Sequence, residues 1–208
     1  MTDKKVAKFS KNDVTIDPIE NLYAGFFKIN LYQFKHALFA GGQSATISRE
    51  ILERGDAVAV LPYDPVTDNL LLIEQIRIGA IKSKQSPWLL ECIAGMTDGS
   101  TDYEAVVKRE ALEEAGLELD ELEFMLSYLS SPGGTTERLY LYLATTDLSQ
   151  LQSGIYGLET EGEDIKTHII SFNEAMARLA SGEIDNAATV ISLQWLALNR
   201  ERIISQQK

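Results

Sequence analysis

Short apolar segments that favour β-strands recur along most of this chain, and they constrain the fold more than any other feature. Residues 57–63 and 70–78 are apolar and β-prone, and the turn-forming residues 64–68 between them complete the pattern of a hairpin. Further strands are predicted at residues 26–39, 45–54, 88–93, 123–129, 138–144 and 165–170. Because helical segments are interleaved with these strands, we expect an α/β protein, a sandwich built around one mixed sheet.

Three segments carry the signals of helices, and the first, residues 101–116, is treated below. Ser171 and Glu174 form a capping box that opens a second helix, which Gly182 ends. The third is predicted at residues 187–203, where three apolar residues have core-facing spacing: Val190, Leu193 and Leu196. The first twenty residues are polar, so we expect them to be loosely held.

The charge of the chain limits its partners. The 208 residues carry a formal net charge of −12, whereas a nucleic-acid or acidic-membrane binder normally needs a basic face. We therefore expect no nucleic-acid partner and no membrane partner. An acidic protein that handles a phosphorylated substrate must recruit positive charge locally, and a divalent metal is the usual device.

Cysteine content and apolar runs indicate a cytoplasmic protein. The single cysteine, Cys92, excludes an internal disulfide and a thiolate cluster, and its apolar neighbours indicate an inert thiol in a buried strand. No apolar run is long enough for a signal peptide or a transmembrane helix. With 45% hydrophobic and 24% charged residues, the composition is that of a soluble globular protein.

The helix predicted at residues 101–116 has signals at both ends. Thr101 and Glu104 form a capping box at its start, and Gly116 is placed to close it in a left-handed conformation. An apolar stripe along it is expected to face the core: Ala105, Val106, Leu112 and Ala115.

Three carboxylates share one side of this helix. Glu110, Glu113 and Glu114 are three and four residues apart, which places their Cβ atoms about 5 to 6 Å from one another. Arg109 can pair with Glu113 but cannot neutralise three acids, whereas a hard divalent cation such as Mg²⁺ or Mn²⁺ can. The alternative is a solvated acidic face. The glycine-rich turn before the helix favours the metal, because its backbone can approach an ion or a phosphate closely.

The spacing of these residues resembles the Nudix box. Gly95 is followed after five residues by Thr101, and after seven more by Arg109-Glu110-Ala111-Leu112-Glu113-Glu114-Ala115-Gly116-Leu117. The family has glutamate where this chain has Thr101, and that glutamate is thought to brace the loop through the box arginine. The resemblance implies the Nudix fold, an α/β/α sandwich around a mixed β-sheet. Asp98, Asp102 or Glu104 is the candidate to replace the missing brace.

Other segments resemble the bacterial ADP-ribose pyrophosphatases within that family. They include residues 90–95, Pro132 at sixteen residues beyond Gly116, and residues 185–188, so that the similarity covers nearly the whole chain. The resemblance implies Mg²⁺-dependent hydrolysis of the pyrophosphate of ADP-ribose to AMP and ribose 5-phosphate. The alternatives are another nucleoside diphosphate sugar, such as GDP-mannose, and a catalytically silent sugar-nucleotide-binding regulator.

The resemblance also implies roles for single residues near the box. Glu110 and Glu114 are expected to bind metal together with the carbonyl of Ala94, and Glu113 is either a further ligand or a partner of Arg109. Residues 157–164 form an acidic loop similar to the family's catalytic loop, with Glu163 as the expected general base and Glu161 as the second candidate. The alternative for this loop is an acidic surface segment without a catalytic role.

Substrate binding is expected from residues that match positions used in the family: Phe26 (or Phe27), Arg49, Arg54, Arg77, Met96 and Glu137. Arg77 could instead be a water-exposed arginine at a sheet edge, and Phe26 could be a core residue. Glu91 is expected to be either exposed or buried with a partner. The two histidines, His36 and His168, are expected to be structural.

The resemblance implies two parts and a homodimer. Residues 1–54 are expected to form an antiparallel β-subdomain that exchanges between subunits, and residues 55–208 are expected to form the hydrolase domain. Some substrate-binding groups would then act across the dimer interface.

Overall fold

The computed structural model describes residues 7–83 and 86–206. Contacts divide the chain into two compact units, and each is described by itself. The N-terminal unit runs to Arg54 and also takes in Ser131–Glu137, whereas the second unit consists of Gly55–Ser130 and the chain from Arg138 onward. The division therefore agrees with a boundary after residue 54, except that the short segment Ser131–Glu137 belongs to the N-terminal unit.

The N-terminal unit is an antiparallel sheet centred on β3 (Lys28–His36), which pairs with β1 (Val14–Ile16), β2 (Glu20–Ala24) and β4 (Ile47–Glu53). Strands were expected where β3 and β4 lie. The expectation that the first twenty residues are loosely held is wrong for residues 11–16, because a 3-10 turn at Lys11–Asp13 leads into β1 and the partner strand β3 supplies the hydrogen bonds. Residues 1–6 lie outside the described part of the chain.

A single eight-stranded mixed sheet forms the frame of the second unit. Its order is β11-β12-β6-β5-β10-β9, with β7 paired to β6 and β8 paired to β5. The pairing of β5 with β10 is parallel and the others are antiparallel. The strands are β5 (Ala57–Asp64), β6 (Asn69–Ile76), β7 (Trp88–Glu91), β8 (Ile93–Met96), β9 (Leu122–Leu129), β10 (Arg138–Thr145), β11 (Ile155–Tyr156) and β12 (Ile165–Ser171).

The β5–β6 hairpin opens away from its turn. The two strands pair directly only at Tyr63↔Leu70 and Asp64↔Asn69, next to the turn. Farther along, β6 pairs with β7 and β5 pairs with β8, so the chain crosses from one strand to the other at Cys92. The single strand expected at residues 88–93 is therefore two short strands with a crossing between them.

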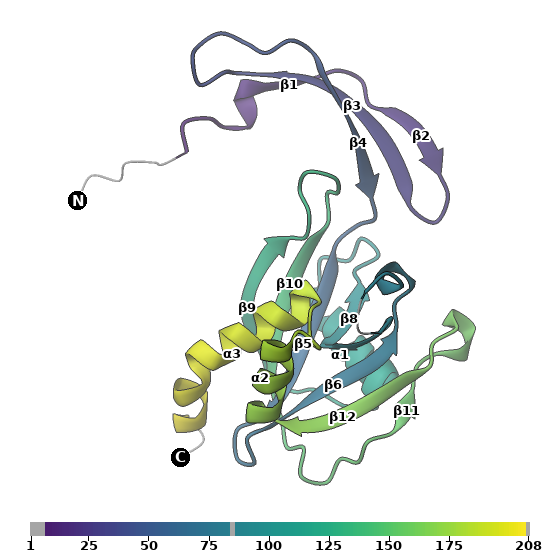
Figure 1. The fold of residues 1–208 in the computed structure, drawn as a ribbon, viewed down its shortest axis with the longest axis vertical. Coiled ribbons are helices and arrows are strands. Elements are labelled where there is room, and N and C mark those ends of the chain that lie inside the picture. Colours follow the sequence, from purple (N-terminus) through teal and green to yellow (C-terminus); the bar gives the residue numbers. More distant parts are fainter. Residues whose placement is uncertain (1–6, 84–85, 207–208) are drawn as a thin grey trace, which may run out of the picture. The chain divides into compact units, whose positions relative to one another are not determined.

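Helices cover both faces of this sheet (Figure 1). They are α1 (Tyr103–Ala115), α2 (Phe172–Ser181) and α3 (Ala187–Ser205). Alternate residues of β5 point to opposite faces: Val58 and Val60 pack in the core that contains α1, whereas Ala59 and Leu61 pack in the core that contains α2 and α3. The expected α/β/α sandwich around a mixed sheet is confirmed.

The helix ends follow the expected signals closely in α2 and α3. Ser171 caps α2 by accepting from the N–H of Glu174, and Gly182 ends it with φ of 79°. In α3, Leu193 and Leu196 are fully buried. Within the described part of the chain, no helix is both long and apolar enough to cross a membrane.

Candidate active site

Helix α1 begins one residue later than the capping-box pattern suggests. Asp102, not Thr101, is the N-cap, and its carboxylate accepts from the N–H of Ala105 at 3.1 Å. Thr101 is exposed and precedes the cap. Gly116 ends the helix as expected, with φ of 61°, and its N–H donates to the carbonyl of Leu112 at 3.0 Å.

The buried side of α1 differs from the stripe expected from its apolar residues. Val106 and Ala115 are buried as expected, but Ala105 and Leu112 are exposed. Val107, Ala111 and Glu114 take the remaining places on the buried side. A carboxylate therefore sits on the core-facing side of this helix while a leucine faces water.

Glu114 is almost fully enclosed, with 3% of its surface exposed. One carboxylate oxygen accepts from the backbone N–H of Ala94 at 3.0 Å, and the other lies 3.5 Å from the side-chain nitrogen of Gln75. Burial raises the pKa of Glu114 to about 8; the hydrogen bond from Ala94 lowers it, and the charge of Glu110 raises it further. Burial therefore favours the neutral form of this carboxylate.

Glu110 lies directly against the backbone of β8. A Cβ atom at Gly95 would come within 1.9 Å of a carboxylate oxygen of Glu110, so only glycine fits there. Arg109 donates to Glu110 at 2.6 Å and to Glu113 at 2.7 Å. Burial nevertheless raises the pKa of Glu110, against the lowering effect of Arg109.

Arg109 is thus held by its two glutamate neighbours. Among the described residues, no ion pair joins Arg109 to Asp98, Asp102 or Glu104. None of these three therefore braces Arg109 in place of the family's glutamate, whose position Thr101 occupies. The pairing of Arg109 with Glu113 matches one of the two roles expected for Glu113.

The loop of Glu163 lies close to these carboxylates. The charge of Glu163 raises the pKa of both Glu110 and Glu114, which places it within electrostatic reach of them. The carboxylate of Glu163 accepts from the N–H of Leu158 at 3.0 Å, and the N–H of Gly157 donates to the carbonyl of Glu113 in α1 at 3.2 Å. Glu161, by contrast, is exposed on the 3-10 turn Glu159–Glu161.

The donor set fits a divalent cation in chemistry, although the side chains are not gathered around a cation position. No group of three acidic, histidine or cysteine side chains in the described residues is arranged to hold an ion. Arg109 takes up oxygens of Glu110 and Glu113 instead. Burial raises the pKa values of both Glu110 and Glu114, and hard oxygen donors of this kind suit Mg²⁺ or Mn²⁺.

Two expected substrate-binding residues belong to the second unit. Arg77 follows the end of β6, is exposed, and donates to Glu91 at 2.8 Å. Glu91 is mostly buried, and burial raises its pKa while Arg77 lowers it, so it is the buried and partnered carboxylate of the two alternatives. Met96 ends β8 opposite Ala57.

The other expected substrate-binding residues belong to the N-terminal unit. Arg54 pairs with Glu137, with 3.1 Å between the side-chain nitrogen and a carboxylate oxygen, and its guanidinium lies over the ring of Phe27. Phe26 is 87% exposed and is therefore not a core residue in this chain. Arg49 is exposed and donates to the carbonyl of Ser48 at 2.7 Å.

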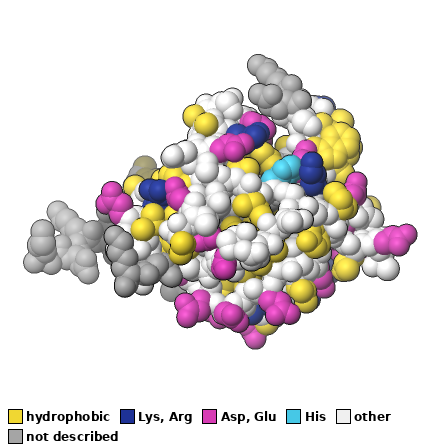
Figure 2. Space-filling view, turned by 90° about the horizontal axis from the view of Figure 1, so that it is seen from below, with side chains coloured by type: hydrophobic (Ala, Val, Ile, Leu, Met, Phe, Trp, Pro, Cys, Tyr) yellow, Lys and Arg dark blue, Asp and Glu magenta, His cyan; other side chains and the backbone are white. Residues whose placement is uncertain are grey.

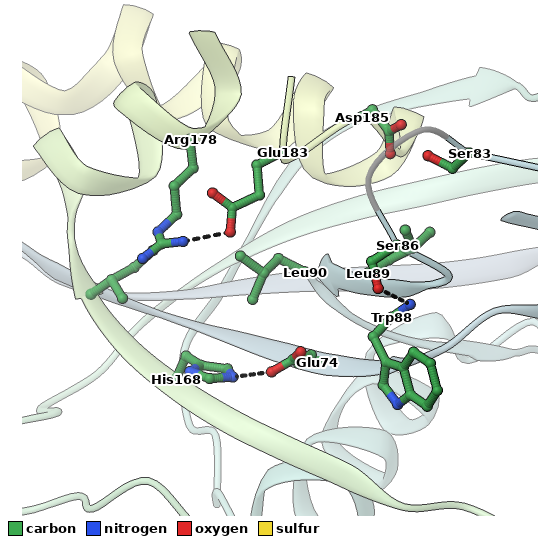
Figure 3. A pocket seen from close by; sticks show the side chains of 11 residues that line it. Glu74, Ser83, Ser86, Trp88, Leu89, Leu90, His168, Arg178, Glu183 and Asp185 are labelled. Atoms are coloured by element: carbon green, nitrogen blue, oxygen red, sulfur yellow. Dashed lines mark hydrogen bonds and ion pairs between the residues drawn. The ribbon is translucent and has the colours of Figure 1, made fainter. Parts of the chain in front are cut away.

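A cavity of about 300 Å³ lies on the sheet face opposite α1 (Figure 3). His168 is bound to Glu74 at 2.7 Å at one side of it. Arg178 pairs with Glu183 at the other side. Because Glu74 and Gln75 point to opposite faces of β6, this cavity is separate from the carboxylates of α1.

On the face shown in Figure 2, the described Lys and Arg side chains form no continuous patch.

Sequence reasoning missed Gln75 as a neighbour of Glu114. Gln75 is 6% exposed and lies on the α1 face of the sheet, whereas the sequence analysis singled out only Arg77 in this strand. The available signal was a polar residue at an inward position of an otherwise apolar strand, which marks a buried polar contact.

Comparison with known proteins assigns the family. Residues 53–192 match the NUDIX domain, and this chain therefore belongs to the Nudix family of hydrolases. Members of this family generally use a divalent metal.

Individual relatives cover nearly the whole chain. It is 48% identical over 201 residues to the ADP-ribose pyrophosphatase of Escherichia coli (strain K12), which covers 97% of this chain and 96% of that protein. It is 31% identical over 181 residues to the GDP-mannose pyrophosphatase of Yersinia pestis (strain Pestoides F), which covers 86% and 89%. The crystal structure of an ADP compounds hydrolase has the same fold, with a TM-score of 0.67 at 20% identity over 93% of this chain and 96% of that chain.

Proposed function

We propose that this chain hydrolyses the pyrophosphate of ADP-ribose to AMP and ribose 5-phosphate, with Mg²⁺ as its cofactor and Mn²⁺ as a substitute. The observation that carries the proposal is the 48% identity to an ADP-ribose pyrophosphatase across nearly both full chains. The geometry supports it independently, because Glu110 lies against the backbone of Gly95 and Glu114 accepts from the N–H of Ala94, so both carboxylates meet the same short strand.

The chain's own residues have separable roles in this reaction. Glu110, Glu114 and the carbonyl of Ala94 would hold the metal, with Glu113 as a further ligand or as the partner of Arg109. When bound, divalent metal neutralises phosphate charge and makes a bound water easier to deprotonate. Gly95 keeps the backbone close to Glu110, and Glu114 is held in place by the N–H of Ala94.

Glu163 is the proposed general base. Its carboxylate lies within electrostatic reach of Glu110 and Glu114, whereas Glu161 is exposed. A residue carried by a loop can accept a proton from the attacking water and move as the site closes over substrate. Glu161 remains the second candidate.

Recognition of the nucleotide is proposed to involve both units and a homodimer. Arg77 and Met96 come from the second unit, and Phe26, Arg49, Arg54 and Glu137 come from the N-terminal one. Within residues 7–54 no side chain is buried, so this sheet lacks a core of its own. A second copy of the chain would supply the missing apolar cover, and sedimentation at several concentrations tests for it.

The substrate test is a product assay by chromatography with ADP-ribose, GDP-mannose and NADH, each with Mg²⁺ and with Mn²⁺. We expect AMP and ribose 5-phosphate from ADP-ribose at the highest kcat/KM. GDP-mannose is the second candidate because of the 31% identity to a GDP-mannose pyrophosphatase. An equal or higher rate on GDP-mannose would overturn the ADP-ribose proposal, and binding without turnover of any substrate would favour a silent regulator.

A further inference from the structure

The crossing between β7 and β8 leaves backbone groups without a strand partner. β7 pairs with β6 and β8 pairs with β5, and Cys92 between them belongs to neither strand. Cys92 is 1% exposed, so water does not satisfy its N–H. Buried N–H groups of this kind require another acceptor.

The N-terminus of α3 provides partners on both sides of the crossing. The hydroxyl of Thr189 accepts from the N–H of Cys92 at 2.8 Å, and Thr189 itself is fully buried. The side-chain amide of Asn186 donates to the carbonyl of Leu90 at 2.7 Å. The other end of the same amide caps α3 by accepting from the N–H of Thr189 at 3.2 Å.

These contacts lie close in sequence to the residues of β8 that touch the carboxylates of α1. Two residues after Cys92, the N–H of Ala94 donates to Glu114 at 3.0 Å. One residue farther, Gly95 lies against Glu110 so closely that a Cβ atom would overlap its carboxylate. A small shift of β8 along its axis would therefore change the surroundings of both glutamates.

We propose that Thr189 and Asn186 are positioning residues that hold the β7–β8 crossing in register, so that the backbone of β8 stays against Glu110 and Glu114, the two glutamates proposed to bind a divalent cation. The proposal rests on the proposed function for the identity of that cation. It assigns a role in the site to the start of α3, which lies on the opposite face of the sheet from α1.

The first variants separate the hydroxyl from the shape of its side chain. Thr189→Val removes the acceptor for Cys92 at nearly the same volume, and Thr189→Ser keeps it. Asn186→Asp keeps the cap of α3 but loses the donor to Leu90. Because residues behind a metal ligand typically change metal affinity or activity by about 10- to 100-fold, we expect Thr189→Val and Asn186→Asp to weaken Mn²⁺ binding about tenfold. Thr189→Ser should restore it.

The control removes a different contact of the same helix. Arg200 of α3 donates to Asp68 at 2.8 Å, next to the β5–β6 turn and away from the crossing. Asp68→Asn should lower the melting temperature while leaving Mn²⁺ affinity and kcat unchanged. Mn²⁺ binding is followed by electron paramagnetic resonance without substrate, and hydrogen exchange of residues 92–95 is measured in the metal-free protein.

The outcomes decide the proposal and the proposed function separately. Wild-type Mn²⁺ affinity and unchanged exchange in both Thr189→Val and Asn186→Asp would overturn the positioning role, as would an equal loss of affinity in Asp68→Asn. If Thr189→Val does not fold, Asn186→Asp decides alone. A wild type that binds Mn²⁺ but leaves ADP-ribose intact would refute the proposed substrate only, because the binding and exchange measurements need no substrate.

Discussion

Replacing Glu114 with glutamine should stabilise the metal-free protein at neutral pH while abolishing turnover. The pKa of Glu114 is raised from 4.5 to about 8, mainly by burial. Because one pKa unit is worth about 1.4 kcal/mol, ionising this carboxylate in the folded chain costs on the order of 5 kcal/mol. Glutamine has nearly the same shape and can still accept from the N–H of Ala94, so it avoids the cost of the charge.

The sign of the pH dependence follows from the direction of the shift. Below pH 4.5 the carboxyl group is protonated in both the folded and the unfolded chain, and no stability is lost. Between pH 4.5 and about 8 only the unfolded chain is ionised, so the free energy of unfolding falls by up to about 1.4 kcal/mol per pH unit. Between pH 5.5 and 7.5 the wild type should therefore lose about 3 kcal/mol relative to Glu114→Gln.

Urea denaturation in the presence of a chelator measures this difference. Both tryptophans of the chain, Trp88 and Trp195, belong to the second unit, so their fluorescence reports its unfolding. Glu104→Gln is the matched control, because Glu104 is exposed on the first turn of the same helix. If the free energies of unfolding of the wild type and Glu114→Gln change in parallel with pH, the reasoning about the raised pKa is refuted. Appreciable residual hydrolysis in Glu114→Gln would refute the role of Glu114 as a metal ligand.

Two further variants test the neighbouring parts of the site. Gly95→Ala should lower kcat about tenfold or more and weaken metal binding, because the new Cβ would displace the carboxylate of Glu110. Circular dichroism should show an intact fold, and wild-type kinetics in this variant would contradict the prediction. Glu163→Gln should lower kcat by roughly 10²- to 10⁴-fold, as expected for loss of a general base, whereas Glu161→Gln should have little effect. Steady-state kinetics across pH compares the two variants. A larger loss of kcat in Glu161→Gln than in Glu163→Gln would assign the base to Glu161.

Much of the fold is readable from local pattern. The strands β5, β6, β10 and β12 and the helix α3 lie close to where apolar spacing and turn residues predict them. The elements that escape prediction depend on distant partners. The short strand β1 has the β-prone sequence Val14-Thr15-Ile16, but it lies in a mostly polar stretch and is held by its pairing with β3. The break at Cys92 exists because β6 and β5 diverge. Neither fact is contained in the residues next to these positions.

The candidate site shows the same division between local spacing and distant contact. Spacing alone places the glutamates of α1 on one side of a helix, and the resemblance of the longer pattern that begins at Gly95 to the Nudix box implies their role as metal ligands. By contrast, Thr189 lies 97 residues from Cys92, and nothing in the sequence near either residue indicates their hydrogen bond.

The departure of α1 from its expected apolar stripe is itself informative. A helix chosen for stability alone would bury Leu112 and expose Glu114, since burying an apolar side chain is favourable and burying a carboxylate is costly. The chain does the reverse, with Leu112 53% exposed and Glu114 3% exposed. Such a violation persists when a function depends on it. The exposed leucine and the buried glutamate therefore support the same proposal as the box spacing, in which a divalent cation offsets the charge of Glu114.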